Sequence, residues 1–174
     1  IATQMPILSA DAWFNKGVSL SAKGAWSDAN YAFDKATKID PDNKMYWVAK
    51  SYVLNKLGNE NAQAAADRAI NLDPDYADAW HERGIALYQA GNYDNSSEAY
   101  KRAIALDGGL WWYYYDYAIL LEAMGLSRGC DSCYADAIKN LDVALKFNLN
   151  NADRNDIYQF KEKITNESLP IPSN

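Results

Sequence analysis

The sequence predicts an all-α fold, a right-handed α-solenoid of four stacked helical hairpins followed by a C-terminal capping helix. Three observations lead to this prediction. The tripeptide Asp-Pro-Asp at 40–42 returns 33 residues later at 73–75, and a degenerate copy, Asp-Gly-Gly, follows 34 residues after that. Apolar residues at helical spacing precede each copy. A large aromatic residue follows each copy: Trp47, Trp80 and Tyr114.

Length and composition agree with one globular domain and exclude several classes of function. The chain has 174 residues, and its 17 basic and 23 acidic side chains leave a net charge of −6. Nucleic acids and anionic membranes require clustered Lys and Arg, so an acidic chain is not expected to bind either of them. No apolar run reaches the roughly 18 residues of a membrane-spanning helix, so no membrane insertion is expected.

The repeats can be phased from Ala10, and they then span 10–43, 44–76, 77–110 and 111–151. Within each repeat, a small residue of the first helix is expected to face a small residue of the second helix, which lets the two backbones approach closely. A single hairpin cannot bury its apolar face, so neighbouring hairpins must stack. Glycines are expected where the first helix of each repeat ends: Gly24, Gly58, Gly91 and Gly125.

The remaining segments flank the repeats. Residues 1–9 form an N-terminal extension that begins with Ile1 rather than Met, which suggests an excised or processed chain. Residues 152–167 are predicted to form the capping helix, with Asp153 as its N-cap. Apolar residues at i, i+3 and i+7 support this helix: Ile157, Phe160 and Ile164. Residues 168–174 are predicted to be a disordered tail or a linker.

This layout resembles the tetratricopeptide repeat (TPR) family, whose 34-residue unit forms a helix-turn-helix, and the resemblance covers about 140 of the 174 residues. The first repeat carries the family residues Trp13, Gly17, Leu20, Ala29, Phe33, Ala36 and Pro41. Repeat 2 is one residue short, and repeat 4 has about seven extra residues between its helices. The resemblance implies a non-catalytic scaffold that binds a protein or peptide in a concave groove lined by the first helices.

The family's groove positions, carried onto this chain, predict an aromatic and acidic lining. Such a groove favours a ligand with apolar and basic anchors. The residues that hold a chaperone's C-terminal carboxylate in some TPR domains are replaced here by Phe14, Val18, Ala49, Asp78 and Glu82, so that ligand is not expected. Trp112 and Tyr115 are predicted as a hot spot. The predicted groove residues are Asp11, Phe14, Tyr52, Asp78, His81, Glu82, Tyr88, Trp112, Tyr115, Asp116 and Glu122.

Few residues could carry out chemistry. His81 is the single histidine and has no predicted nucleophile beside it, so a groove-lining role is favoured over that of a catalytic base. Two cysteines and one histidine are too few for a four-ligand zinc site. The sequence also lacks a Gly-rich phosphate loop and a calcium loop. Neither a cofactor nor a metal is therefore expected, and the chain is predicted not to be an enzyme.

Cys130 and Cys133 lie in the extra segment of repeat 4. Their i, i+3 spacing in a turn can bring the Cα atoms within the roughly 4.4–6.8 Å that a disulfide requires. A local disulfide is favoured over free thiols, while a catalytic redox pair would need a βαβ context that is absent and zinc shared between chains is a remote alternative. With the Asn-x-Ser triplets at 95–97 and 166–168, the cysteines slightly favour an extracytoplasmic location over a cytoplasmic one.

Two other functions stay open from the sequence. The chain could be the regulatory or substrate-docking module of a larger enzyme, which the sequence on either side would reveal. It could instead be a self-association module whose Tyr and Trp side chains join neighbouring solenoids, so its oligomeric state is uncertain.

Overall fold

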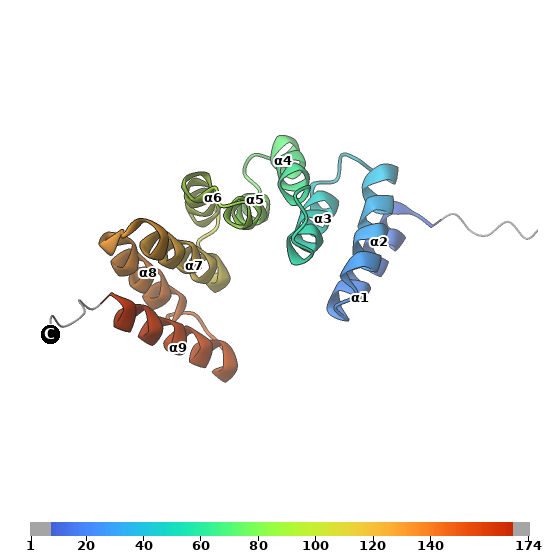
Figure 1. Ribbon diagram of the computed structural model, residues 1–174. Coiled ribbons are helices and arrows are strands. Elements are labelled where there is room, and N and C mark those ends of the chain that lie inside the picture. The colour runs from blue at the N-terminus through green and yellow to red at the C-terminus, as the bar shows by residue number, and fades with distance from the viewer. Residues whose placement is uncertain (1–7, 169–174) are drawn as a thin grey trace, which may run out of the picture.

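The computed structural model describes residues 8–168, and all the regular secondary structure in that range is helical. The predicted all-α solenoid is confirmed: the helices pair into hairpins, and the hairpins follow one another along a curved stack (Figure 1). The first helices of the hairpins are α1 (Ala10–Ala22), α3 (Lys44–Lys56), α5 (Ala77–Gln89) and α7 (Trp111–Arg128). The second helices are α2 (Trp26–Ile39), α4 (Ala62–Leu72), α6 (Tyr93–Leu106) and α8 (Asp131–Ala144).

Small residues let the two helices of a hairpin pack closely. A Cβ atom added to Gly17 would lie 2.5 Å from the ring of Phe33, and one added to Gly84 would lie 3.0 Å from the ring of Tyr100. A serine can occupy such a position when its hydroxyl finds a backbone partner: Ser51 Oγ donates to the carbonyl oxygen of Ala62 at 2.8 Å. In the first and third hairpins, the first helix thus leaves a recess that a ring of the second helix fills.

The turn of the fourth hairpin differs from the sequence-based expectation. The turns after α1, α3 and α5 contain the predicted glycines at positive φ, as at Gly91 with a φ of 74°. In the fourth hairpin Gly125 lies inside α7, so the prediction that it ends this helix is wrong. Gly129, with a φ of 63°, ends the helix instead. Most of the extra residues therefore lengthen α7 to 18 residues, against 13 in α5.

Neighbouring hairpins are joined by polar contacts that recur at the repeat spacing. The Tyr46 hydroxyl donates to the carboxylate of Asp11, and the Tyr113 hydroxyl donates to Asp78, in each case over 35 residues. Ion pairs link the second helix of one hairpin to the helix that follows it: Asp34–Lys50 at 2.9 Å, Asp67–Arg83 at 2.8 Å and Asp142–Lys161 at 2.5 Å. Lys16 stands at the matching place in α1 and has no carboxylate partner among residues 8–168; it lies over the Trp13 ring.

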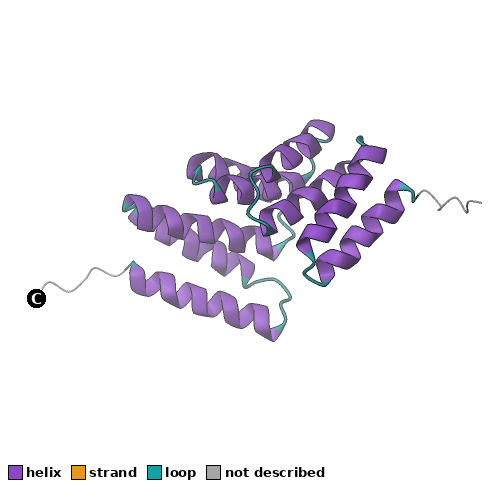
Figure 2. Cartoon of the chain, turned by 45° about the vertical axis from the view of Figure 1, so that its right-hand side comes forward, coloured by secondary structure: helices purple, strands orange, loops and turns teal. Residues whose placement is uncertain are grey.

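The ninth helix, α9 (Asn151–Glu167), packs beside the hairpin of α7 and α8 (Figure 2). Ile157 and Ile164 are fully buried in the core that it shares with these two helices. The N-cap is Asn150, whose Oδ1 accepts the backbone N–H of Asp153 at 2.8 Å, so the prediction of Asp153 as the cap is wrong. The sequence predictions for 1–7 and 169–174 lie outside the described residues.

No helix within 8–168 combines the length and apolar character that crossing a membrane demands.

Candidate functional site

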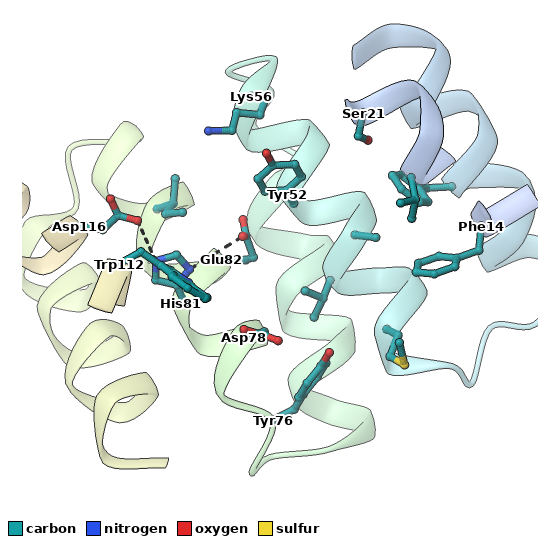
Figure 3. Close-up of a pocket in the computed structure, with 16 residues that line it drawn as sticks. Phe14, Ser21, Tyr52, Lys56, Tyr76, Asp78, His81, Glu82, Trp112 and Asp116 are labelled. Atoms are coloured by element: carbon teal, nitrogen blue, oxygen red, sulfur yellow. Dashed lines mark hydrogen bonds and ion pairs between the residues drawn. The ribbon is translucent and has the colours of Figure 1, made fainter. Parts of the chain in front are cut away.

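The first helices of all four hairpins surround a pocket of about 500 Å³ (Figure 3). We call it the groove pocket. Of the ten exposed large hydrophobic side chains in the described part of the chain, four line it: Val18, Met45, Tyr52 and Trp112. Exposed apolar side chains gathered in one hollow are typical of a binding surface.

Helical spacing explains how the sequence builds this pocket. Residues four apart lie on one face of a helix, one turn above the other. Phe14 and Val18 therefore both reach the pocket from α1, and Val48 and Tyr52 both reach it from α3. The same spacing brings in two further pairs of lining residues: His81 and Ile85 from α5, and Trp112 and Asp116 from α7.

A cluster of ionisable groups forms the polar floor of the groove pocket. His81 Nε2 lies 2.8 Å from Asp116 Oδ2, and His81 Nδ1 lies 3.9 Å from Glu82 Oε1 (Figure 3). The Asn55 side-chain amide donates to Glu82 Oε2 at 2.7 Å and to the Glu82 carbonyl oxygen at 3.0 Å. One imidazole thus stands between two carboxylates, and the amide holds one of them in place.

The Glu82 carboxyl is the most perturbed acid of the pocket. Only 7% of the residue is exposed, and this burial raises the pKa of its carboxyl to about 7. The imidazole of His81 and the amide of Asn55 lower the pKa without cancelling the effect of burial. Burial disfavours the charged form, so Glu82 is only partly ionised near neutral pH.

Tyr113 supports the ionisable cluster at the floor of the groove pocket through contacts with His81 and Asp78. Its side chain is fully buried, its ring stacks on that of His81 with 4.5 Å between the centroids, and its hydroxyl donates to Asp78. Burial first, and then the hydrogen bond to Asp78, raise the pKa of the Tyr113 hydroxyl far above its usual range, so this hydroxyl remains a donor. The sequence could have indicated this role, because Tyr46 and Asp11 form the same pair with the same spacing.

Two segments of the chain match the family model described as tetratricopeptide repeat, at residues 10–43 and 77–110. These are the first and third of the repeats phased from Ala10, and the hairpins of α3–α4 and α7–α8 continue the same stack. The chain contains tetratricopeptide repeats. No curated protein sequence matches it significantly.

Solved TPR structures share the fold. The first TPR domain of Spaghetti (RPAP3), bound to an HSP90 peptide, has a TM-score of 0.62 at 19% identity, over 67% of this chain and 94% of that one. MamA from Desulfovibrio magneticus RS-1, from residue 41 to its end, has a TM-score of 0.68 at 19% identity, over 81% and 78%. YrrB, described as a TPR protein with an unusual peptide-binding site, has a TM-score of 0.65 at 20% identity, over 88% and 74%.

The TPR array brings some of the predicted groove residues together in the pocket and places others elsewhere. Seven line the groove pocket: Phe14, Tyr52, Asp78, His81, Glu82, Trp112 and Asp116. Two lining residues were not predicted: Lys56 at the rim and Tyr76 at the opposite end of the pocket. Tyr76 precedes α5, so it belongs to no helical stripe.

Four predicted groove residues lie outside the groove pocket of the TPR array. Asp11 accepts a hydrogen bond from the Tyr46 hydroxyl, and Tyr88 stacks on Tyr93 with 5.8 Å between the ring centroids.

The other two face the capping helix. The Tyr115 ring lies 5.6 Å from that of Phe160, and the buried Glu122 carboxylate accepts from Lys163 Nζ at 2.6 Å. Helix α9 therefore covers the side of α7 on which Tyr115 and Glu122 were expected to meet a ligand.

The two cysteines of the TPR array lie away from the groove pocket. A disulfide joins Cys130, at the N-cap of α8, to the buried Cys133, with 5.3 Å between the Cα atoms. It fixes the start of α8 directly after the Gly129 turn. Within residues 8–168 no group of three or more His, Cys, Asp or Glu side chains could hold a metal ion.

Proposed function

We propose that this TPR chain is a non-catalytic scaffold that binds a protein or peptide in the groove pocket. The observation that carries the proposal is the gathering of exposed apolar side chains in one hollow of about 500 Å³ beside a cluster of carboxylates. Two of its structural neighbours are described with a peptide or a peptide-binding site. Those neighbours support a scaffold role for the present chain, and the chemistry of the ligand follows from its own residues.

The proposed ligand offers apolar anchors and a basic side chain. Trp112 and Tyr52 are 40% and 37% exposed, so each ring can bury further area when an apolar side chain packs on it. The carboxylates of Asp78, Glu82 and Asp116 line the same pocket and favour a cation.

The same charges disfavour an acidic chain end. The neighbour Spaghetti (RPAP3) binds the peptide SRMEEVD, which is rich in carboxylates. In this chain, Asp78 and Glu82 occupy positions where a carboxylate clamp would need donors, and the pocket offers Lys56 alone as a side chain with a permanent positive charge. We therefore propose that a chaperone C-terminal carboxylate is not the ligand.

A non-catalytic role agrees with the surroundings of the one histidine. His81 is 6% exposed and lies between the carboxylates of Glu82 and Asp116, with its ring stacked on Tyr113. No hydroxyl or thiol nucleophile is hydrogen-bonded to this imidazole within the described residues. The arrangement supports a binding floor rather than a nucleophile activated by a base.

A defined library of capped peptides tests the proposal. Each peptide is made in two forms, with lysine or with norleucine at one position, and is titrated against the wild-type chain, Trp112→Ala and Leu126→Ala. Leu126 is a matched control, because it is 60% exposed on the same helix but lies outside the pocket. We expect Trp112→Ala to weaken binding at least about fivefold, which is about 1 kcal/mol, and Leu126→Ala to leave it unchanged.

Two outcomes would contradict the proposal. One is that no peptide binds the wild-type chain. The other is that both variants lose affinity equally, which would place the binding surface outside the groove pocket. Sedimentation of the wild-type chain over a range of concentrations distinguishes a peptide binder from a self-association module.

A further inference from the structure

We propose that the Glu82 carboxylate binds a basic side chain of the ligand in exchange for a proton, so that the groove pocket binds such a ligand more tightly at pH 8 than at pH 6. This inference rests on the proposed function and adds its regulation: the scaffold releases a basic ligand when the surroundings become acidic.

The geometry leaves one oxygen of Glu82 incompletely bonded. Oε2 accepts from the Asn55 amide at 2.7 Å, whereas the contact of Oε1 with His81 Nδ1 is 3.9 Å long, beyond hydrogen-bond distance. An ionised carboxylate can accept about four hydrogen bonds, so Glu82 retains accepting capacity on the side of Oε1. The residue lines the pocket, which places that capacity within reach of a ligand.

Polar and charged groups on three helices determine the charge balance around Glu82. Asn55 and Lys56 lie on α3, His81 on α5 and Asp116 on α7. Two carboxylates share one imidazole here, and Lys56 makes no ion pair with either of them among the described residues. An ammonium or guanidinium group from the ligand would therefore supply the positive charge that this cluster lacks.

The direction of the pH dependence follows from this balance. Burial raises the pKa of Glu82 to about 7, so in the empty pocket the carboxyl carries a proton for part of the time at neutral pH. A bound cation favours the ionised form, and by linkage ionisation favours the cation. Ionisation of Glu82 therefore makes a basic ligand bind more tightly as pH rises.

The lysine peptide that binds most tightly in the library, and its norleucine counterpart, serve as probes. We expect the lysine peptide to bind up to about tenfold more tightly at pH 8 than at pH 6, since a carboxyl with a pKa of about 7 is about one-tenth ionised at pH 6 and about nine-tenths ionised at pH 8. The norleucine peptide should show no such change. Glu82→Gln should make the affinity of the lysine peptide independent of pH, since glutamine can still accept from Asn55 but does not titrate.

The two proposals fail in different ways. Equal pH dependence for the two peptides, or an unchanged pH dependence in Glu82→Gln, overturns the proton exchange while leaving peptide binding intact. Loss of binding by both peptides at every pH overturns the proposed function. Carboxyl ¹³C resonances of the wild-type chain give a second readout that needs no variant: saturation with the lysine peptide should lower the Glu82 titration midpoint, and an unmoved midpoint contradicts the exchange.

Discussion

His81 and Asp116 form a contact of 2.8 Å between Nε2 and Oδ2 that joins α5 to α7 at the floor of the groove pocket. Tyr113 strengthens the same junction from one turn earlier in α7, because its buried ring stacks on His81. Trp112, the residue before Tyr113, is 40% exposed and faces the pocket. These two adjacent residues of α7 therefore have different roles: Tyr113 joins the hairpins, and Trp112 exposes its ring to the pocket.

We therefore expect Trp112→Ala and Tyr113→Ala to differ in their effects on the free energy of unfolding. Trp112→Ala removes an exposed ring and should change the free energy of unfolding by less than about 1 kcal/mol. Tyr113→Ala removes a fully buried ring and should cost about 3–5 kcal/mol. Urea denaturation followed by circular dichroism measures both values. A comparable loss in the two variants would mean that Trp112 belongs to the core.

Tyr115→Ala should reduce stability and leave ligand affinity unchanged. Its ring packs against Phe160 of α9, and aromatic pairs of this kind contribute about 0.5–1.5 kcal/mol beyond the buried area. We expect a total loss of about 2 kcal/mol in the free energy of unfolding. Phe160→Ala and the double variant complete a cycle in which the two losses are less than additive. Additive losses, or a weakened peptide affinity in Tyr115→Ala, would place the ring in the groove instead.

Gly17→Ala should destabilise the first hairpin. The added methyl group would lie 2.5 Å from the buried ring of Phe33, and overpacking of this kind costs about 1–3 kcal/mol. The higher helix propensity of alanine offsets about 1 kcal/mol of that cost. Thermal and urea denaturation should therefore show a net loss of up to about 2 kcal/mol. Ser19→Ala, at an exposed position of the same helix, should behave as wild type.

Glu82 should make stability depend on pH. The pKa of this carboxyl is about 7 in the folded chain and about 4.5 in the unfolded chain, so the folded state binds the extra proton between those values. The contribution of Glu82 to stability is therefore complete below about pH 4.5, falls as pH rises to about 7, and is constant above that. At about 1.4 kcal/mol per unit of pKa, the total change is about 3 kcal/mol.

Comparison with Glu82→Gln isolates this effect, because glutamine does not titrate. Between pH 4.5 and pH 8, the free energy of unfolding of the wild-type chain should fall by about 3 kcal/mol relative to that of Glu82→Gln. Parallel stability curves for the two proteins over this range would show that folding does not raise the pKa of Glu82.

The disulfide should contribute modestly to stability. Cys130 and Cys133 close a loop of only four residues, and chain-entropy arguments assign such a small loop about 2 kcal/mol. A thiol assay on the unfolded, unreduced chain should detect no free thiol, and reduction should lower the free energy of unfolding by about that amount. Free thiols before reduction would contradict the assignment.

Local patterns were sufficient to predict the helices and their pairing, because these features depend on residues within one repeat. The groove pocket could be predicted in part for the same reason: Phe14, Tyr52 and Trp112 occupy groove positions of their own helices. Tyr113 could not be assigned from helical position alone. Its contacts with His81 and Asp78 cross between hairpins.

The errors near the C-terminal end have a different cause. Gly125 and Gly129 are four residues apart, and it is the packing of Gly125 against Tyr134 and the positive φ of Gly129 that show which of them lies inside the helix. Tyr115 and Glu122 occupy groove positions, yet α9 adds Phe160 and Lys163 directly over them. A periodic pattern cannot predict that contact, because the capping helix is not part of the repeat.

The two ends of this array differ in their capacity for growth. Lys16 places a basic side chain at the position where the second and third hairpins pair with an aspartate of the helix before them, so a hairpin grafted ahead of Ala10 could extend this series of ion pairs with a suitably placed aspartate. At the opposite end Lys161 and Lys163 already satisfy Asp142 and Glu122. Further units appended there would first have to displace α9, so the array is more readily lengthened ahead of Ala10 than after α8.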